Sequence, residues 1–440
     1  MSIDADALFE RFRQRVEPTL SPTYRVAVAY SGGLDSTVLL HLFARLRASV
    51  PFQLSACHVH HGLSPHADAW LEHCAGQCAV LAVPLVAERV DLTQVVGGGV
   101  EERARHARYA IFEALGVDCV AMAHHRDDQA ETVVYRLARG AGLRGAAGMP
   151  VRRRLGQAAS LLWRPLLDES RQALLAYANA HQLAWVTDES NTSDAYDRNY
   201  LRQVVLPSLY ARFPAAPVTI ARAAQHWAEA AELVDALAEI DAGGWRVRLP
   251  IQCLVQLSEM RQRNVLQWFL GRHGVRLEAK QLALLLGQIL TAKPDTNPCL
   301  RVGDRVIHRY RDELWVAQHL PAPSAIRLEE GVGEQVIPAW GGVLQWRPAD
   351  GGLAPDMLHD VELRPRLGGE SIQLHAGGST RAVKTLFQEA GIPPWLRARW
   401  PLLWRGGELL AVPGIGVATD YQVANGAAPH WRPFDWADAP

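Results

Sequence analysis

The sequence predicts an α/β protein: a parallel sheet with helices on both faces, then a helical middle domain and a small mixed α/β C-terminal domain. Three observations support this prediction. Short β-favouring runs alternate with helical runs up to residue 125. An alanine-rich stretch without strand alternation follows from about residue 215, and the chain beyond about residue 330 is rich in Gly, Pro and Trp.

The N-terminal alternation begins with RVAVAY at 25–30, a short apolar run typical of a buried strand. A glycine turn leads into a helix at 37–46, whose apolar side chains recur at helical spacing. The same pattern predicts strands at 52–61, 84–90 and 118–125, and helices at 67–81 and 101–115. Repeated β-α units form parallel sheets, so the polar motifs that follow the strands should converge at the carboxyl edge of the sheet.

The later part of the chain predicts two further domains. Residues 214–244 form one long helical stretch, and helix-like segments recur near 254–271 and 278–291. LPAPSAI at 320–326 is a proline-containing junction, and short β-like runs such as VIPAW and LLAVPGI follow it. We therefore expect domains at residues 1–215, 216–320 and 330–440.

Composition limits the functional classes. The 440 residues carry 45 basic and 46 acidic side chains, so a formal net charge of −1 argues against bulk electrostatic attraction to nucleic acid. However, seven arginines and no acid lie between residues 132 and 164, a local run that suits a polyanion. Six scattered cysteines predict free thiols, and the charged N-terminus without a long apolar run predicts a cytoplasmic protein.

The turn SGGLDS, between the first strand and its helix, predicts a phosphate-binding loop. Its glycines permit positive φ and close backbone approach, and the N–H groups of the helix start favour an anion. Asp35 at such a site predicts a Mg²⁺ ion between its carboxylate and the phosphates. The alternative is an ordinary turn with Ser36 as the helix cap. The residues expected to contact the phosphates are Ser31, Gly32, Gly33, Leu34, Asp35 and Ser36, with His60 at the end of the next strand.

SGGLDS resembles the loop motif of the PP-loop ATP pyrophosphatases, which implies an adenine nucleotide alpha-hydrolase-like fold. Further motifs resemble the tRNA(Ile)-lysidine synthetase family across nearly the whole N-terminal domain: HVHHGLS, GGVEERARHARYAIFEAL, AHHRDDQAETVVYRLARGAGLRGAAGMP, RPLLDESRQALLAYA and DESNTSDAYDRNYLRQVVLPSL. ELRPRLGGESI and VKTLFQEAGIPPWLRARWPLL resemble the C-terminal domain of that family. The middle domain matches in position and size only.

The resemblance implies that lysine is ligated to C2 of the wobble cytidine of a CAU-anticodon isoleucine tRNA, with ATP and Mg²⁺. It also implies that the later domains bind tRNA, and it suggests a homodimer. Two alternatives remain: another PP-loop enzyme that modifies tRNA, such as a base thiolase, and an inactive RNA-binding protein. The absence of a C-x-x-C pair counts against thiolation, and the intact motifs count against inactivity.

The acidic residues of DDQAE carry the remaining predicted chemistry. Glu131 lies one helical turn beyond Asp127 and three residues beyond Asp128, so at least two carboxylates share a helix face. They suit an ammonium or Mg²⁺; the alternative is that one caps the helix while Glu131 pairs with an arginine. We expect Asp35, Asp127 and Glu131 to be catalytic, and Asp128 to bind substrate.

Two other polar segments remain open. The segment from Asn191 to Arg202 reads as a surface turn or as part of the site, and the resemblance assigns substrate binding to Arg198, Asn199 and Arg202. Histidines and cysteines between residues 58 and 78 invite a zinc site, but their spacing is unusual for zinc and polar contacts to a nucleotide are favoured. In the C-terminal domain, arginines interleaved with tryptophans fit either RNA binding or a packed core.

Overall fold

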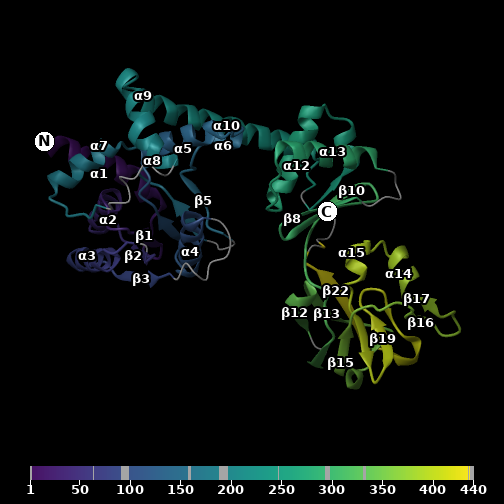
Figure 1. Cartoon of the computed structure of the whole chain (residues 1–440). Coiled ribbons are helices and arrows are strands. Elements are labelled where there is room, and N and C mark those ends of the chain that lie inside the picture. Colours follow the sequence, from purple (N-terminus) through teal and green to yellow (C-terminus); the bar gives the residue numbers. More distant parts are fainter. Residues whose placement is uncertain are drawn as a thin grey trace. The chain divides into compact units, whose positions relative to one another are not determined.

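The computed structural model describes residues 2–62, 64–90, 99–156, 160–187, 197–245, 247–292, 298–330, 333–434 and 436. It divides into two units, Met1–Leu233 and Val234–Pro440 (Figure 1), which are treated separately below.

The first unit is built on a six-stranded sheet of order β3-β2-β1-β4-β6-β5. All neighbouring strands in it are parallel except β5 and β6, which form an antiparallel pair at the edge. The predicted parallel sheet is thus confirmed. Its strands are β1 (Arg25–Ala29), β2 (Gln53–His60), β3 (Leu85–Arg89), β4 (Cys119–Ala121), β5 (Arg152–Arg154) and β6 (Leu161–Trp163).

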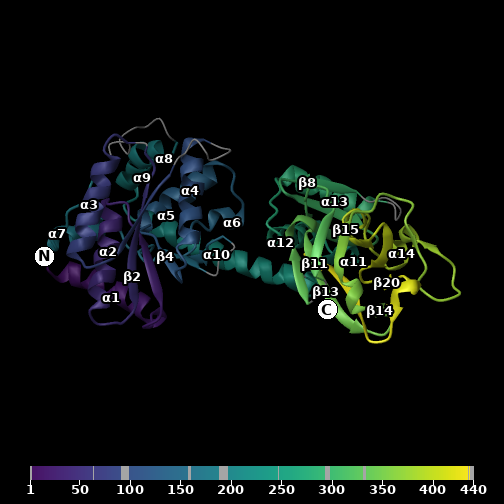
Figure 2. The same ribbon diagram turned by 90° about the horizontal axis from the view of Figure 1, so that it is seen from below.

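Helices cover both faces of this sheet (Figure 2). Side chains alternate along each strand, so Val26 and Val28 of β1 join one core while Val120 of β4 joins the other. The larger core also takes apolar side chains from α1 (Ser2–Val16), α2 (Leu34–Arg47), α3 (Ala67–Val80) and α7 (Arg171–Ala180). The smaller core, on the other face, is closed by α4 (Val100–Ala114).

The end of β4 leads into α5 (Arg126–Ala138) and the short α6 (Leu143–Ala146). Residues after the sheet form α8 (Asp197–Tyr200), the π-helix η3 (Leu201–Val205), α9 (Leu206–Arg212) and the long α10 (Ala216–Asp241). Within the described ranges no single helix is long and apolar enough to span a membrane. Only the pair Asp197–Arg212 and Ala216–Asp241, bent by 100°, reaches that length and composition together.

The second unit begins with a helical region that also contains a sheet. Its helices are α11 (Ile251–Val255), α12 (Glu259–Arg272) and α13 (Ala279–Thr291). A four-stranded sheet of order β7-β10-β9-β8 packs with them, an element that the sequence analysis does not anticipate. Its strands are β7 (Arg248–Pro250), β8 (Cys299–Val302), β9 (Arg305–Tyr310) and β10 (Glu313–Gln318).

The C-terminal region contains two five-stranded sheets, of order β11-β15-β18-β19-β20 and β12-β13-β22-β14-β21, and a two-stranded sheet, β16-β17. Helices α14 (Val383–Glu389) and α15 (Pro394–Arg397) complete it, which confirms the mixed character. The strands are β11 (Ile326–Glu330), β12 (Glu334–Ile337), β13 (Gly342–Ala349), β14 (Gly352–Leu353), β15 (His359–Arg364), β16 (Ser371–Ile372), β17 (Arg381–Ala382), β18 (Leu402–Arg405), β19 (Glu408–Val412), β20 (Gly416–Val417), β21 (Gln422–Val423) and β22 (Gly426–Pro433).

Tryptophans of the C-terminal region are largely structural. Trp340 and Trp400 are buried, and the indole N–H of Trp400 donates to the Pro413 carbonyl at 2.8 Å. Trp395 stacks on His308 with ring centroids 3.9 Å apart. Arg397 and Arg399 donate to backbone carbonyls, so these side chains fit the packed-core alternative.

Phe43 is the centre of an aromatic cluster beneath the first sheet, because its ring is fully buried and contacts Phe12, Phe52 and Trp163. We expect Phe43→Ala to lower the free energy of unfolding by about 3–5 kcal/mol through lost burial and a residual cavity. Urea unfolding measures this value. Phe213→Ala, at a phenylalanine that is 57% exposed, is the matched control, and an equal loss in both variants would contradict the assignment.

Candidate active site

The turn after β1 takes its shape from Gly32. This residue has φ of +84°, a conformation that favours glycine, and an added Cβ atom would lie 2.9 Å from Cys74 Sγ and 3.1 Å from Val186 Cγ2. The Val186 N–H donates to the Gly32 carbonyl at 2.9 Å, and the Thr37 hydroxyl donates to the same carbonyl at 3.3 Å. The turn is therefore held from three sides and cannot accept a larger residue without shifting.

Gly33 is different, because it does not use the positive φ that a glycine permits. Its φ is −72°, it is the N-cap of α2, and an added Cβ atom would meet only Ser31 Oγ at 3.5 Å and the Val186 carbonyl at 4.0 Å. Within the protein any small residue fits. A need for glycine at this position would come from a ligand approaching the backbone.

The hydroxyls of the loop bind each other. Ser31 Oγ and Ser36 Oγ lie 3.0 Å apart, and Ser36 also donates to the Gly33 carbonyl at 3.0 Å. Ser36 is therefore not the helix cap considered as the alternative; Gly33 occupies that position. The N–H groups of the first turn of α2 have no i−4 carbonyl to bind, which leaves them directed at the loop. The loop thus combines free donors with the positive end of a helix.

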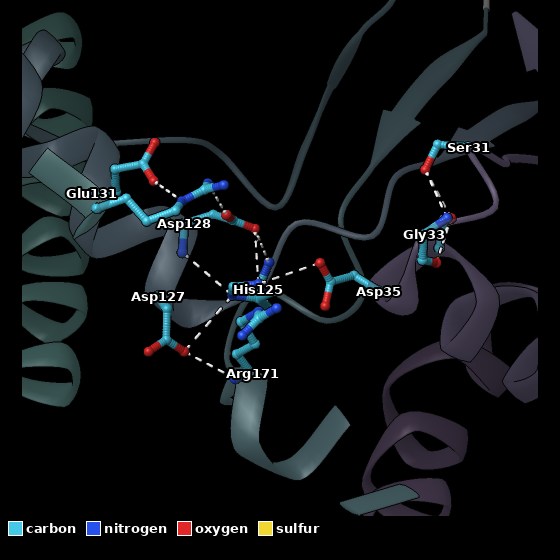
Figure 3. A network of polar contacts seen from close by, with 10 residues as sticks. Ser31, Gly33, Asp35, His125, Asp127, Asp128, Glu131 and Arg171 are labelled. Atoms are coloured by element: carbon cyan, nitrogen blue, oxygen red, sulfur yellow. Dashed lines mark hydrogen bonds and ion pairs between the residues drawn. The ribbon is translucent and has the colours of Figure 1, made fainter. Parts of the chain in front are cut away.

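Asp35 faces the second polar motif. Its Oδ2 atom lies 3.7 Å from His125 Nε2, while its Oδ1 atom is buried and has no hydrogen-bond partner among the described residues. Figure 3 shows Asp35 pointing across to His125 at the start of α5. The motifs after β1 and β4 therefore converge at the carboxyl edge of the sheet. The motif after β2 lies beside them, because His58 Nδ1 is 2.9 Å from the Tyr30 carbonyl.

His125 links the acidic residues, although the sequence analysis assigned it no role. It is buried and caps α5: its N–H donates to Asp128 Oδ2 at 3.0 Å and its Nδ1 accepts from the Asp128 N–H at 3.3 Å. Burial lowers its pKa, but the hydrogen bond to Asp35 and the charges of Asp128, Asp35 and Asp127 outweigh burial and raise the pKa overall. In the sequence, only its position in AHHRDDQ, directly before the predicted helix, indicates this capping role.

The three predicted acids of α5 all have protein partners (Figure 3). Asp127 Oδ2 accepts a hydrogen bond from the Arg171 N–H at 2.9 Å, at the start of α7. Asp128 caps its own helix, and Glu131 Oε2 accepts from Arg202 Nε at 2.7 Å. These contacts are those of the capping and pairing alternative. They also hold all three carboxylates within the region that Asp35 faces.

Arg202 joins two of these acids. Besides Glu131 it binds Asp128, with Nη2 3.1 Å from Oδ1. Glu131 is buried, and that burial raises its pKa even though the charges of Arg202 and Arg198 lower it. Arg198 lies 3.5 Å from Glu131 and donates to the Thr132 hydroxyl at 3.2 Å. Asn199 lies on the same short helix, whereas Asn191 is outside the described residues.

The histidine and cysteine cluster is next to the loop. His60 Nε2 lies 3.2 Å from Asp68 Oδ1, and Cys74 Sγ lies 3.5 Å from His58 Nδ1. In the part of the chain that the structure describes, no three His, Cys, Asp or Glu side chains form a group able to hold a metal ion. All six cysteines are free thiols.

Comparison with known proteins identifies the family. A PP-loop domain family matches residues 6–209, a TilS substrate binding domain family matches 249–315, and a TilS substrate C-terminal domain family matches 361–432. The tRNA(Ile)-lysidine synthase of Chromobacterium violaceum is 42% identical over 98% of this chain and 99% of its own length. The chain belongs to the tRNA(Ile)-lysidine synthase family. Its PP-loop domain implies ATP binding.

Another relative of the same name and one solved structure are also similar to this chain. The tRNA(Ile)-lysidine synthase of Pseudomonas aeruginosa is 43% identical over 88% of this chain and 89% of its own length. Among solved structures, the U34-tRNA thiolase NcsA from Methanococcus maripaludis, described with its [4Fe-4S] cluster, covers 52% of this chain and 81% of its own. Its identity is 16% and its TM-score 0.44, a similarity that carries no functional argument.

The packing around Gly32 predicts the effect of a methyl group on ATP binding. We expect Gly32→Ala to weaken ATP binding more than tenfold, because the new Cβ atom forces a shift of the turn and strains its positive φ. Calorimetric titration with ATP measures the affinity. Gly76→Ala is the control, since an added Cβ atom there meets nothing within 4 Å; equal ATP affinities in the two variants would contradict the role of Gly32.

His124 predicts a loss of stability in acid. Burial and the charges of Arg164, His125, Arg198 and Arg105 lower its pKa to about 3. A histidine with a lowered pKa binds fewer protons in the folded than in the unfolded chain, so stability falls as pH drops below about 6.5.

We expect the free energy of unfolding to fall between pH 7.5 and pH 5 by about 1–2 kcal/mol more in the wild type than in His124→Asn. Urea unfolding at both pH values measures the difference. His66→Asn, at an exposed histidine, is the control and should keep the wild-type slope. A wild-type slope in His124→Asn as well would show that the side chain does not titrate as expected.

Proposed function

We propose that this chain ligates lysine to C2 of the wobble cytidine of the CAU-anticodon tRNA(Ile), using ATP and releasing AMP and pyrophosphate. Full-length similarity to relatives named tRNA(Ile)-lysidine synthase supports the activity. The observation that carries the site assignment is the continuous polar chain from Asp35 through His125 to Asp128, Arg202 and Glu131. It joins the phosphate loop to a group of carboxylates.

The reaction has two bond-changing steps. The cytidine O2 attacks the α-phosphorus of ATP, and the bond to the bridging oxygen breaks as pyrophosphate leaves. The lysine ε-nitrogen then attacks C2, the C2–O2 bond breaks, and AMP leaves with that oxygen. In the first step the N–H groups at the start of α2 stabilise charge on the departing pyrophosphate.

A Mg²⁺ ion fits this loop at Asp35. The buried Oδ1 atom of this residue has no hydrogen-bond partner among the described residues, and a carboxylate oxygen is a ligand that Mg²⁺ prefers. One or two carboxylates commonly suffice, because phosphates and water supply the other ligands. When bound, the ion would neutralise charge on the phosphates. Ser31, Gly32, Gly33, Leu34, Ser36 and His60 are the other proposed ATP contacts.

The carboxylates would handle the lysine amine, whose pKa of about 10.4 keeps it protonated at neutral pH. Glu131 is the best placed to take the proton, because its raised pKa brings it closer to the pH of the reaction. We assign Asp127 with Glu131 to the lysine ammonium. Asp128, Arg198, Asn199 and Arg202 would bind substrate on the same side. Arg202 holds two of the carboxylates in place before lysine arrives.

The remaining assignments are broader. We propose residues 1–215 as the catalytic domain, and residues 216–320 and 330–440 as tRNA-binding domains. The matches at 249–315 and 361–432 support the last two. A homodimer and a cytoplasmic location stay predictions.

Base thiolation is less well supported. Cys74 is the thiol beside the loop, where its Sγ atom would meet a Cβ atom on Gly32. Burial raises the pKa of Cys74 to about 12, so it stays protonated at neutral pH. A sulfur-transferring cysteine needs a thiolate, so the neighbouring thiol is unsuited to that role.

The test combines the protein with tRNA(Ile) transcript, ATP, Mg²⁺ and labelled lysine. We expect label on the tRNA with one AMP per lysine, and a loss of at least a hundredfold in kcat/KM for Asp35→Asn, because its carboxylate faces the reacting phosphates. Asp118→Asn is the control. Asp118 directly precedes β4 and therefore lies at the amino end of the strands, away from the loop. Unlabelled tRNA with the wild type would refute the activity, whereas full activity in Asp35→Asn would refute only the assignment of Asp35.

A further inference from the structure

A cationic cluster lies next to the carboxylate site, and none of the assignments above uses it. Arg164 follows β6, and its guanidinium is buried, with only 3% of the residue exposed. Its Nη1 atom donates to the Pro150 carbonyl at 2.8 Å, while its Nε atom has no hydrogen-bond partner in the part of the chain that the structure describes. The buried Nδ1 atom of His124 likewise has no partner among the described residues. We call Arg105, Arg153 and Arg164 the cationic cluster; the imidazole of His124 borders it.

The rim of the cluster is accessible. Arg105 on α4 is exposed and Arg153 on β5 is half-buried. Both guanidinium groups lie over the ring of Tyr109, at 5.5 Å and 5.0 Å from its centroid. Burial raises the pKa of Tyr109, but a hydrogen bond from Arg153 and the charges of Arg105, Arg153 and Arg164 lower it overall. A strong positive field therefore reaches the surface here.

Nothing in the described part of the chain neutralises this charge. No carboxylate of the described residues forms an ion pair with Arg105, Arg153 or Arg164. Burial lowers the pKa of Arg164 to about 10; Tyr109 opposes this shift and Arg153, Arg105 and Arg136 reinforce it, and the group stays charged at neutral pH. A buried charge without a counter-charge costs several kcal/mol. An anion at the rim would offset that cost.

We propose that the cationic cluster binds a phosphodiester of the substrate RNA close to the modified cytidine, with Arg105 and Arg153 making the contacts and Arg164 positioned beneath them. This inference rests on the proposed function. The cluster adjoins the carboxylate site, because Arg198 acts on His124 as well as on Glu131. A phosphate held there would fix the ribose and base of one nucleotide relative to Asp35 and Glu131.

The surroundings favour RNA over the carboxylate of free lysine. Arg105 and Arg153 come from different elements and both reach the surface, and the segment between residues 132 and 164 contains no acid. A single carboxylate needs one guanidinium, whereas two arginines side by side match a phosphodiester and the phosphates next to it. Arg152 of the same strand points to the other face of the sheet, 4.4 Å from the ring centroid of Trp163, and is not part of this rim.

The first test separates the substrates kinetically. We expect Arg105→Ala and Arg153→Ala each to raise KM for tRNA about tenfold, as for loss of one charge-assisted hydrogen bond. KM for ATP and lysine should stay within twofold. The slope of log affinity for tRNA against log salt should become shallower by about one. Arg25→Ala removes an exposed arginine at the amino end of β1 and should change none of these values.

The second test identifies the phosphate. Each phosphodiester of the tRNA anticodon loop is replaced in turn by a neutral methylphosphonate, and binding is measured by filter retention without turnover. One replacement should weaken binding to the wild type about tenfold and leave binding to Arg153→Ala unchanged, because that variant has already lost the contact. Both rim side chains are at least partly exposed, so these variants avoid the folding risk of changing Arg164.

The outcomes distinguish the two proposals. A rise in KM for lysine with unchanged KM for tRNA would mean that the cluster binds the amino acid carboxylate, and would overturn the inference. Equal losses in the wild type and Arg153→Ala at every methylphosphonate position would also overturn it. Binding needs no catalysis, so a wild type that forms no lysidine would refute the proposed function while the phosphate contact could still be established.

Discussion

The packing of the chain around Gly32 is the constraint on which the rest of the site depends. The backbone passes between Cys74 of α3 and Val186 after α7, with no room for a side chain. The Gly32 carbonyl accepts hydrogen bonds from both Val186 and Thr37, which fixes the direction in which α2 leaves the sheet. That direction sets where the donors of the loop and the carboxylate of Asp35 point. The proposed contacts between the loop and the nucleotide follow from this turn.

Two consecutive histidines after β4 interact with groups of opposite charge. His125 faces Asp35, Asp127 and Asp128, whose charges outweigh burial and raise its pKa. His124 is half-buried beside arginines, and desolvation together with their charges lowers its pKa. The residues differ by one position in the sequence but lie in fields of opposite sign. The site therefore has an acidic side and a basic side, with the end of β4 between them.

Much of this arrangement could be predicted from the sequence. Apolar strands alternating with helices predicted β1, α2, β2, α3, β3 and α4 close to their observed bounds, because apolar side chains recur at strand or helix spacing. The strand predicted at 118–125 is shorter in the structure, where β4 covers only Cys119–Ala121. The convergence of the motifs after the strands follows from parallel topology alone. The four-stranded sheet at 248–318 escaped prediction because its strands are short, and β8 and β9 are half-polar.

Contacts between distant segments could not be predicted from local pattern. Glu131 and Arg202 are 71 residues apart, so the pairing depends on how the chain returns after the sheet. The hydrogen bond from the start of α7 to Asp127 likewise depends on how two distant segments pack together. The sequence also could not show which of the two adjacent glycines adopts positive φ; in the structure Gly32 does and Gly33 does not. Burial of Arg164 gives no local signal, since arginine is ordinarily exposed.

The division into acidic and basic sides suits a reaction between a cation and a polyanion. A lysine ammonium and an RNA phosphate attract each other, so a single undivided pocket would let them pair and hold the amine away from the base. In the proposed arrangement, separate sides would bind the ammonium at the carboxylates and the phosphodiester at the arginines. The cytidine would then lie between them, in front of Asp35. Arg202 and Arg198 pair with Asp128 and Glu131, and this pairing lowers the repulsion between the two carboxylates.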